Sequence, residues 1–148
     1  MKDKLARHDK DLGPLLESFV NRVSHTKGRA MEFMLASAVT SGQAILLNTA
    51  LLHTDCTPTD LAASMRLSLS SVSQMIERLV KLELVTRNEA AGDRRRKSIT
   101  VTANGRTFLD QLKAIRIEEY AEGTAGLSAA TRHSLTAAIR QALAELET

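Results

Sequence analysis

Hydrogen-bonding side chains gather near the start of one predicted helix, between Ser68 and Leu82. They are three serines and a glutamine: Ser70, Ser71, Ser73 and Gln74. A helix about 10–12 Å across fits the major groove of B-DNA, where glutamine pairs with adenine through two hydrogen bonds and serine contacts either base type. This surface favours contact with base edges, although serine-rich faces also occur on ordinary exposed helices.

Four consecutive cations lie further along the chain: Arg94, Arg95, Arg96 and Lys97. The period changes from 3.6 to 2 on either side of them, which predicts a hairpin with strands at 85–87 and 98–102 and a turn at 91–93. Arginine on such a projecting arm can enter the minor groove, where the negative potential attracts it. A solvated, inert charge run is the alternative for this feature alone. The adjacency of the two features favours DNA binding.

Several predicted helices must position these residues. Apolar periodicity indicates helices over 11–24, 29–39, 42–53, 58–66, 69–82, 103–122 and 128–146. Thr57 and Ser68 are predicted N-caps, and Pro58 suits the first position of its helix. The order of helix, short helix, tight turn, helix and hairpin predicts a winged helix-turn-helix. The fold class is mainly α with a small β-hairpin wing, plus a helical dimerisation domain.

Composition and charge limit the function classes. The 148 residues are 43% hydrophobic and 25% charged, which is ordinary globular composition. Residues 59–106 carry nine basic and five acidic side chains, a net charge of +4, which hints at a polyanionic partner. With neither a secretory signal nor a transmembrane run, we expect a cytoplasmic protein that does not enter the membrane.

The stretch from about Val39 to Leu109 resembles the multiple antibiotic resistance regulator (MarR) family of bacterial repressors. The resemblance is carried by Leu61-Ala62, by the run from Leu67 to Ser73, by Arg78-Leu79 and by Leu84-Val85. Its most specific part is Asp93-Arg94-Arg95, followed by Ile99, Val101-Thr102 and Gly105. The sequence departs from the family pattern at several positions. Glu83 stands where the family usually has glycine, Val101 replaces a common leucine, and Leu69 and Gln74 stand where arginine is frequent.

The resemblance implies roles for individual residues. Ser70, Ser71, Ser73 and Gln74 would contact bases. Arg95 would enter the minor groove, with Asp93 orienting it or the turn. The remaining residues would contact or neutralise the phosphate backbone: Thr57, Thr59, Ser68, Arg78, Arg94, Arg96 and Lys97.

The resemblance also implies a homodimer on a near-palindromic operator. Residues 1–38 and 106–148 would form the dimerisation part, and residues 39–105 the DNA-binding domain. The apolar pattern of the sequence agrees with a homodimer. The winged segment has enough apolar residues for a core of its own, so the apolar stripes at 11–24 and 128–146 need another partner. Two helices about 34 Å apart would then reach successive major grooves.

A small aromatic or anionic effector is implied by the same resemblance. Its candidate pocket residues are Phe19, His25, Arg29, Met31, Phe33 and Met34, although a Met/Phe stripe is more often plain core. An effector of this kind would release a repressor from its operator.

Three other functions are weighed against this one. Neither a Gly-rich phosphate loop nor a nucleophile elbow nor a His-Glu-x-x-His sequence occurs, so we expect no enzyme and no cofactor. Cys56 lies at a helix N-terminus, which can lower a thiol pKa, and His53-x-x-Cys56 has a spacing that a metal could use, but a metal site is not expected. The alternative hypotheses are a redox- or metal-responsive regulator and a winged-helix module that binds protein.

Overall fold

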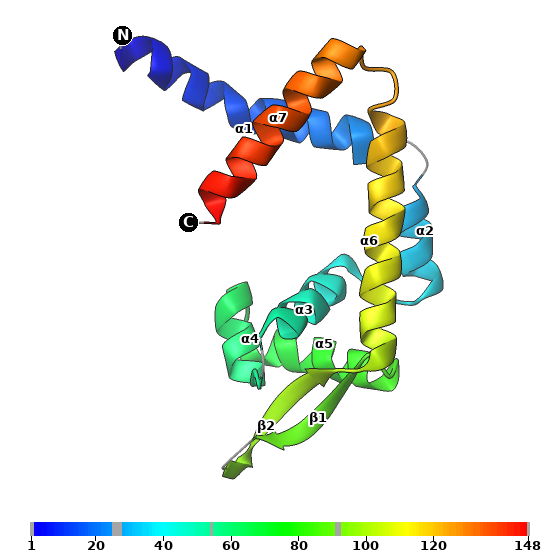
Figure 1. The fold of residues 1–148 in the computed structure, drawn as a ribbon. Coiled ribbons are helices and arrows are strands. Elements are labelled where there is room, and N and C mark those ends of the chain that lie inside the picture. Colours follow the sequence, from blue (N-terminus) through cyan, green and yellow to red (C-terminus); the bar gives the residue numbers. More distant parts are fainter. Residues whose placement is uncertain (1, 25–27, 54, 91–92, 148) are drawn as a thin grey trace. The chain divides into compact units, whose positions relative to one another are not determined.

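The structure is a computed structural model. It describes residues 2–24, 28–53, 55–90 and 93–147, and for residues 2–10, 90 and 93–96 it describes the backbone alone. The elements, in chain order, are α1 (Lys2–Ser24), α2 (Arg29–Ala36), α3 (Ser41–Leu52), α4 (Pro58–Met65), α5 (Leu69–Lys81), β1 (Val85–Ala90), β2 (Asp93–Val101), α6 (Ala103–Gly123) and α7 (Ala129–Leu146) (Figure 1). The predicted fold class, mainly α with a two-stranded antiparallel hairpin, is confirmed.

The chain divides into two compact units. One comprises Met1–Gly28 and Arg116–Thr148, and the other comprises Arg29–Ile115. The second unit therefore holds α2 and the first half of α6 together with the helix-turn-helix and the hairpin. The boundaries predicted from the sequence assign α2 and most of that half of α6 to the dimerisation part. The dimerisation role itself stays a prediction.

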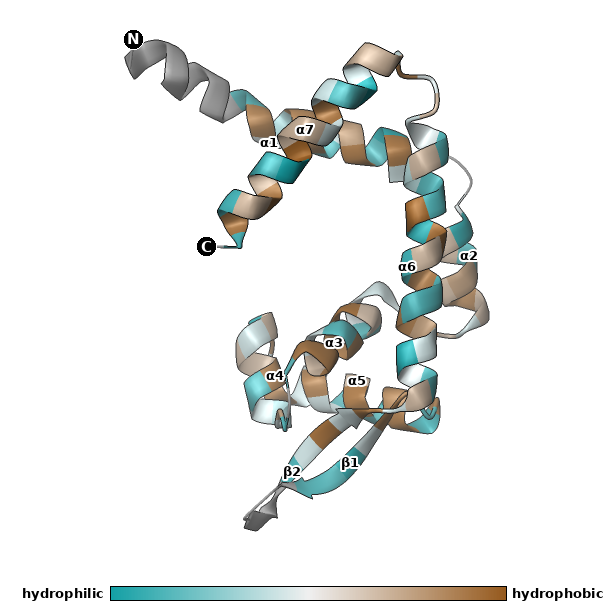
Figure 2. Ribbon diagram, viewed as in Figure 1, coloured by the Kyte–Doolittle hydropathy of each residue, from teal (hydrophilic) through white to brown (hydrophobic). Residues whose placement is uncertain are grey.

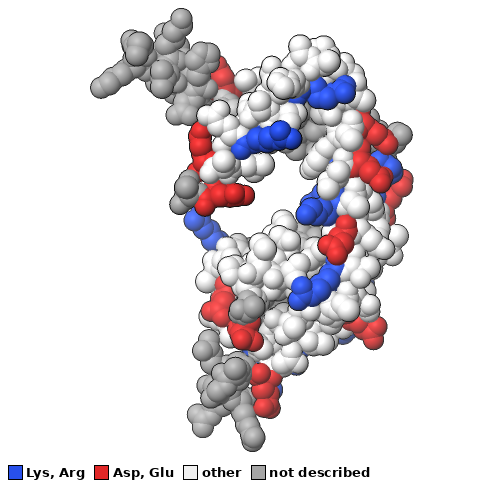
Figure 3. Space-filling model, viewed as in Figure 1, with Lys and Arg blue, Asp and Glu red and all other residues white. Residues whose placement is uncertain are grey.

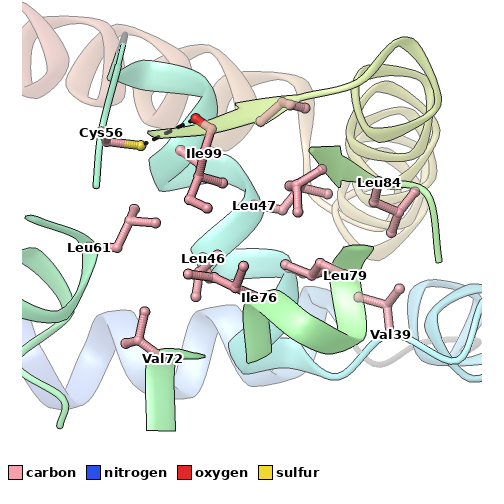
Figure 4. Packing of buried hydrophobic residues seen from close by; sticks show 14 of the residues in the cluster. Val39, Leu46, Leu47, Cys56, Leu61, Val72, Ile76, Leu79, Leu84 and Ile99 are labelled. Atoms are coloured by element: carbon pink, nitrogen blue, oxygen red, sulfur yellow. Dashed lines mark hydrogen bonds between the residues drawn. The ribbon is translucent and has the colours of Figure 1, made fainter. Parts of the chain in front are cut away.

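The core of the second unit lies where α3, α4, α5 and the hairpin meet (Figure 4). Aliphatic side chains fill it, and the largest fully buried ones are Leu46, Leu47, Leu61, Val72, Ile76, Leu79, Val85 and Ile99. Each such burial contributes roughly 1.5–3 kcal/mol to folding. The second unit thus has a hydrophobic core of its own, as the winged-helix pattern predicts.

Hydrogen-bonded caps fix where the helices of the second unit begin. The predicted N-caps are confirmed at Thr57 and Ser68, whose hydroxyls accept the backbone N–H of Asp60 and Ser71. At Thr57 the side chain of Asp60 also accepts the cap's own N–H, which completes a capping box. Such a cap stabilises a helix by about 1 kcal/mol.

The junction between α5 and β1 needs a left-handed residue. Glu83 occupies it with φ of 58°, a conformation that glycine adopts without strain and that L-residues adopt at a cost. Its carbonyl accepts a hydrogen bond of 2.7 Å from the Thr102 hydroxyl, which ties this turn to the start of α6. Glu83 therefore keeps the left-handed backbone that glycine would adopt at this position.

The helices of the first unit leave apolar side chains exposed. α1 starts nine residues earlier than the predicted helix at 11–24, and of the predicted inner stripe only Val23 is buried. α7 has no buried residue at all. Brown hydrophobic residues recur along both helices in Figure 2. Most of the apolar side chains at 11–24 and 128–146 are therefore left in water within the single chain.

No single helix among the described residues is long and apolar enough to cross a membrane. α2 and α3 together meet the criterion of length and composition, but they are bent by 85° at their junction.

Candidate nucleic-acid interface

The predicted base-reading surface lies on α5, opposite the side chains that anchor this helix to the core. Val72, Ile76 and Leu79 are fully buried. Ser70, Gln74 and Arg78 are exposed, and their i, i+4, i+8 spacing places them on one face of the helix. Burial of the first stripe therefore forces the second outward.

Two of the predicted contact hydroxyls are engaged with each other at the start of α5. The oxygens of Ser68 and Ser71 lie 2.8 Å apart, and the N–H of Ser71 donates to Ser68 at 3.1 Å. Ser71 and Ser73 are half-buried. Ser68 and Ser71 thus secure the helix N-terminus, and the outward polar groups of this turn are Ser70 and Gln74.

A tight connection presents the N-terminus of α5. Arg66 ends α4 in the left-handed conformation, with φ of 54°. The N–H of Leu67 then donates to the carbonyl of Ala62 at 3.0 Å, the pattern of a Schellman motif. This turn is short, so α5 begins at Leu69, only a few residues after α4 ends at Met65.

Thr57 and Thr59 differ in what they can offer to a phosphate. Thr57 is buried, and its hydroxyl donates to the Asp60 carboxylate at 2.7 Å while accepting the Asp60 N–H at 3.2 Å. Thr59 is exposed in the first turn of α4. The exposed side chain of Thr59 is therefore accessible to a phosphate, whereas the hydroxyl of Thr57 is not.

The hairpin is attached to the core through one face. Val85 pairs with Val101 across the two strands, and both are buried, as is Ile99. The N–H of Ile99 donates to the carbonyl of Cys56 at 2.8 Å, which ties β2 to the segment before α4. The hairpin is therefore held in the same unit as α5 (Figure 1).

The tip of the hairpin carries the predicted cations. β2 begins at Asp93, so Arg94, Arg95 and Arg96 belong to a strand, where the pattern predicts a loop tip. The side chains of residues 93–96 lie outside the described part of the chain. Lys97 is exposed and lies opposite Glu89 in the strand register.

Two polar features of the hairpin are not predicted by the sequence pattern. The amide of Asn88 donates to the hydroxyls of Thr86 and Thr100, at 3.3 and 3.0 Å, on an exposed face. Arg87 faces Glu77 of α5 with a nitrogen–oxygen distance of 4.0 Å, which links strand and helix. The Asn88–Thr100 contact depends on the register of the two strands, and the Arg87–Glu77 contact depends on the packing of β1 against α5.

Charge is mixed over the face of the molecule in Figure 3, where lysine and arginine atoms lie among aspartate and glutamate atoms. The described surface on this face therefore carries charges of both signs. The net charge of +4 of residues 59–106 includes the four hairpin cations.

The predicted effector residues fall into both units. Phe19 belongs to the first unit, where it lines a groove of about 420 Å³ with residues of α6 and α7. Phe33 and Met34 pack against the core of the second unit, and Phe33 stacks on Phe108 with ring centroids 5.2 Å apart. Met31 is exposed and Arg29 half-buried, and His25 lies outside the described residues.

Cys56 is buried, with its thiol directed at the carbonyl of Ile99 at 3.8 Å (Figure 4). Burial raises the pKa of this thiol. A backbone hydrogen bond lowers the pKa by less than burial raises it, and the carboxylates of Asp60 and Asp55 raise it further. The direction of this pKa shift favours the protonated form of the Cys56 thiol. Among the described residues, no group of three His, Cys, Asp or Glu side chains is placed to hold a metal ion.

The fold and the interface together define a winged helix-turn-helix protein. A model described as MarR family matches residues 39–96, so the predicted resemblance is confirmed over this segment. No curated protein matches the chain.

Solved structures share the whole architecture. A point mutant of Staphylococcus aureus MepR bound to an oligodeoxyribonucleotide is 22% identical, with a TM-score of 0.68 over 90% of this chain and 96% of that one. Wild-type MarR from Escherichia coli, in its apo form, is 22% identical, with a TM-score of 0.66 over 89% and 96%. YusO from Bacillus subtilis is 21% identical, with a TM-score of 0.68 over 98% and 97%. These likenesses establish the fold.

Proposed function

We propose that this chain is a sequence-specific, double-stranded DNA-binding transcription regulator, a repressor that binds a near-palindromic operator as a homodimer. One observation carries the proposal: Ser70 and Gln74 are exposed on the outward face of α5, in the same compact unit as the cationic hairpin. Hydroxyl and amide groups there can hydrogen-bond base edges, while backbone N–H groups at the helix start attract phosphate.

The cationic residues supply the part of the affinity that does not depend on sequence. Arg78 and Lys97 are exposed, and with Arg94 and Arg96 they can neutralise phosphates and release condensed counterions. Arg95 is proposed to enter the minor groove, oriented by Asp93. Thr59 and Ser68 would add phosphate contacts at the starts of α4 and α5.

A shared fold with a DNA complex supports the proposal. The S. aureus MepR–DNA complex is 22% identical to this chain, with a TM-score of 0.67 over 86% of it. That protein is bound to DNA with the architecture described above. This chain could therefore bind DNA through α5 and the hairpin.

Exposed apolar side chains support the homodimer. On α1, Leu12, Leu15 and Leu16 are 56%, 65% and 52% exposed, and on α7 Ile139 and Leu143 are 46% and 54% exposed. Contiguous apolar surface of this kind marks association sites. A second copy, with the same helices, presents the matching surface that a two-fold interface requires.

Release by a small aromatic or anionic effector is the finer part of the proposal. The groove of about 420 Å³ beside Phe19 supports it, because an aromatic ring fits a space of this size and an apolar lining. Small aromatic carboxylates should then raise the melting temperature of the protein and weaken its hold on the operator. Thermal shift and gel-shift titrations with benzoate would check this.

Selection of bound duplexes from a random pool, repeated at two salt concentrations, tests the proposed function. Enrichment of one near-palindromic sequence, with affinity that falls steeply with salt, is expected. A pool that stays random would refute the proposal and favour the protein-binding alternative.

The Arg95→Ala variant tests the role of the hairpin. It should bind the selected operator more weakly and with a shallower salt dependence, since one cationic contact is lost. Its melting temperature should equal that of the wild type. Unchanged binding in a gel-shift titration would count against a hairpin contact with DNA.

A further inference from the structure

Leu69 is an exposed apolar side chain at the start of α5, beside the polar surface. It is the first residue of the helix and is 50% exposed, next to the exposed Ser70. The other leucine of this helix, Leu79, is fully buried. A leucine that stays half in water at this place has apolar surface that a ligand can cover.

The turn between α4 and α5 explains why the neighbouring Leu67 is apolar, but it does not explain why Leu69 is. Leu67 is 41% exposed and follows the left-handed Arg66, at the position where a Schellman motif usually carries an apolar residue. Leu69 lies beyond the Ser68 cap, inside α5, on the flank between the buried stripe and the polar face. At exposed positions of this kind a polar helix former would serve the helix equally well.

We propose that Leu69 reads the C5-methyl group of thymine, so that the operator half-site contains an A·T pair beneath the start of α5. The proposal rests on the proposed function. The thymine methyl is the apolar feature that base pairs present in the major groove, and an aliphatic side chain is the group that recognises it. Gln74, exposed on the same helix, favours adenine through its amide. An aliphatic group and an amide on one helix thus both select A·T pairs.

The expected size of the effect follows from the area that a methyl group buries. Covering one methyl group is worth about fourfold in affinity. Replacing thymine by uracil removes that methyl group and leaves the base pair intact. The wild-type protein should therefore bind the operator about fourfold more weakly when the thymine under Leu69 is replaced in one half-site.

The test uses the operator selected above, with each thymine of a half-site replaced by uracil, one at a time. Binding is measured for the wild type, Leu69→Ala and Val80→Ala. Val80 is the matched control, since it is 37% exposed on the same helix, eleven residues or about 16 Å further along. Thermal melting of each variant establishes that it is folded.

The expected result is one thymine position at which the wild type and Val80→Ala lose about fourfold while Leu69→Ala binds both duplexes equally. If Leu69→Ala discriminates as strongly as the wild type, another group reads the methyl and the inference is wrong. If the wild type binds every uracil-substituted duplex as well as the operator, the inference is wrong while the proposed function stands. If no operator can be selected at all, both fail.

Discussion

At the scale of single residues, the polar groups of the interface divide by what they already bond. The hydroxyls of Thr57, Ser68 and Ser71 are committed to helix caps, with contacts between 2.7 and 3.2 Å. Ser70 and Gln74 are exposed on the outward face of α5. We therefore expect base specificity to depend on Ser70 and Gln74. The capping hydroxyls are expected to contribute to helix stability.

The Gln74→Ala variant should change base preference more than overall affinity. Loss of a bidentate contact to adenine removes about 1–3 kcal/mol of discrimination at one base pair, while phosphate contacts remain. Binding to the operator and to its single-base variants measures this. Gln111→Ala, which removes an exposed glutamine of α6, is the matched control. A uniform loss across all operator variants would contradict the assigned role.

Cys56 should make folding stability depend on pH in the alkaline range. Its pKa is raised in the folded chain above the ordinary value of 9.0, so the unfolded chain releases this proton first. The free energy of unfolding should consequently fall as the pH rises above about 9. Urea denaturation on either side of that pH measures the slope. Cys56→Ala should flatten it, and an equal slope in both proteins would argue against the buried thiol as its source.

At the scale of elements, the hairpin and α6 are held together by close backbone contact. A Cβ on Gly105, in the first turn of α6, would stand 2.2 Å from the carbonyl oxygen of Leu84 and 2.8 Å from a methyl group of Val101. The hydroxyl of Thr102 caps the same turn by accepting the N–H of Gly105 at 3.0 Å. The glycine of the motif is thus required by packing between α6 and the start of β1.

The Gly105→Ala variant should be destabilised by about 1–3 kcal/mol, because a backbone carbonyl cannot yield as a flexible side chain can. Gly42→Ala is the matched control. Its Cβ would meet only the sulfur of Met75, at 3.8 Å, and alanine suits a helix better than glycine. Urea denaturation of both variants checks the difference. Equal stability of Gly105→Ala and the wild type would refute the packing argument.

At the scale of the whole molecule, the two units differ in whether their apolar surface is covered. The second unit encloses a core, whereas α1 and α7 of the first unit leave large apolar side chains in water. Water-exposed leucines on two helices are costly for a single chain. They are well explained by burial against the same helices of a second copy.

The variants Leu15→Glu and Leu143→Glu should dissociate the proposed dimer. A carboxylate buried at the interface without a partner costs several kcal/mol, which weakens association by about a hundredfold or more. Ile45→Glu is the matched control, since Ile45 is 59% exposed on α3, outside the proposed interface. Sedimentation equilibrium measures the oligomeric state. Dimers that persist in both α1 and α7 variants would exclude these helices from the interface.

Local patterns were sufficient to predict the elements and their order. Thr57 and Ser68 cap their helices as predicted, and the change of period after Leu84 located the hairpin. These features depend on interactions within a few residues, so a short stretch of sequence contains them. The extension of β2 back to Asp93 and the start of α1 at Lys2 were missed, because polar residues carry no apolar period.

The chain's own residues determined the winged-helix order and the polar character of the α5 surface, since spacing and side-chain chemistry are written in the sequence. Only the tertiary structure decided which of those groups remain available. It buried Thr57 and Cys56 and joined the hydroxyls of Ser68 and Ser71, whereas Ser70 and Gln74 stayed exposed. Burial depends on contacts between segments far apart in the chain, and the pattern of one segment does not contain them.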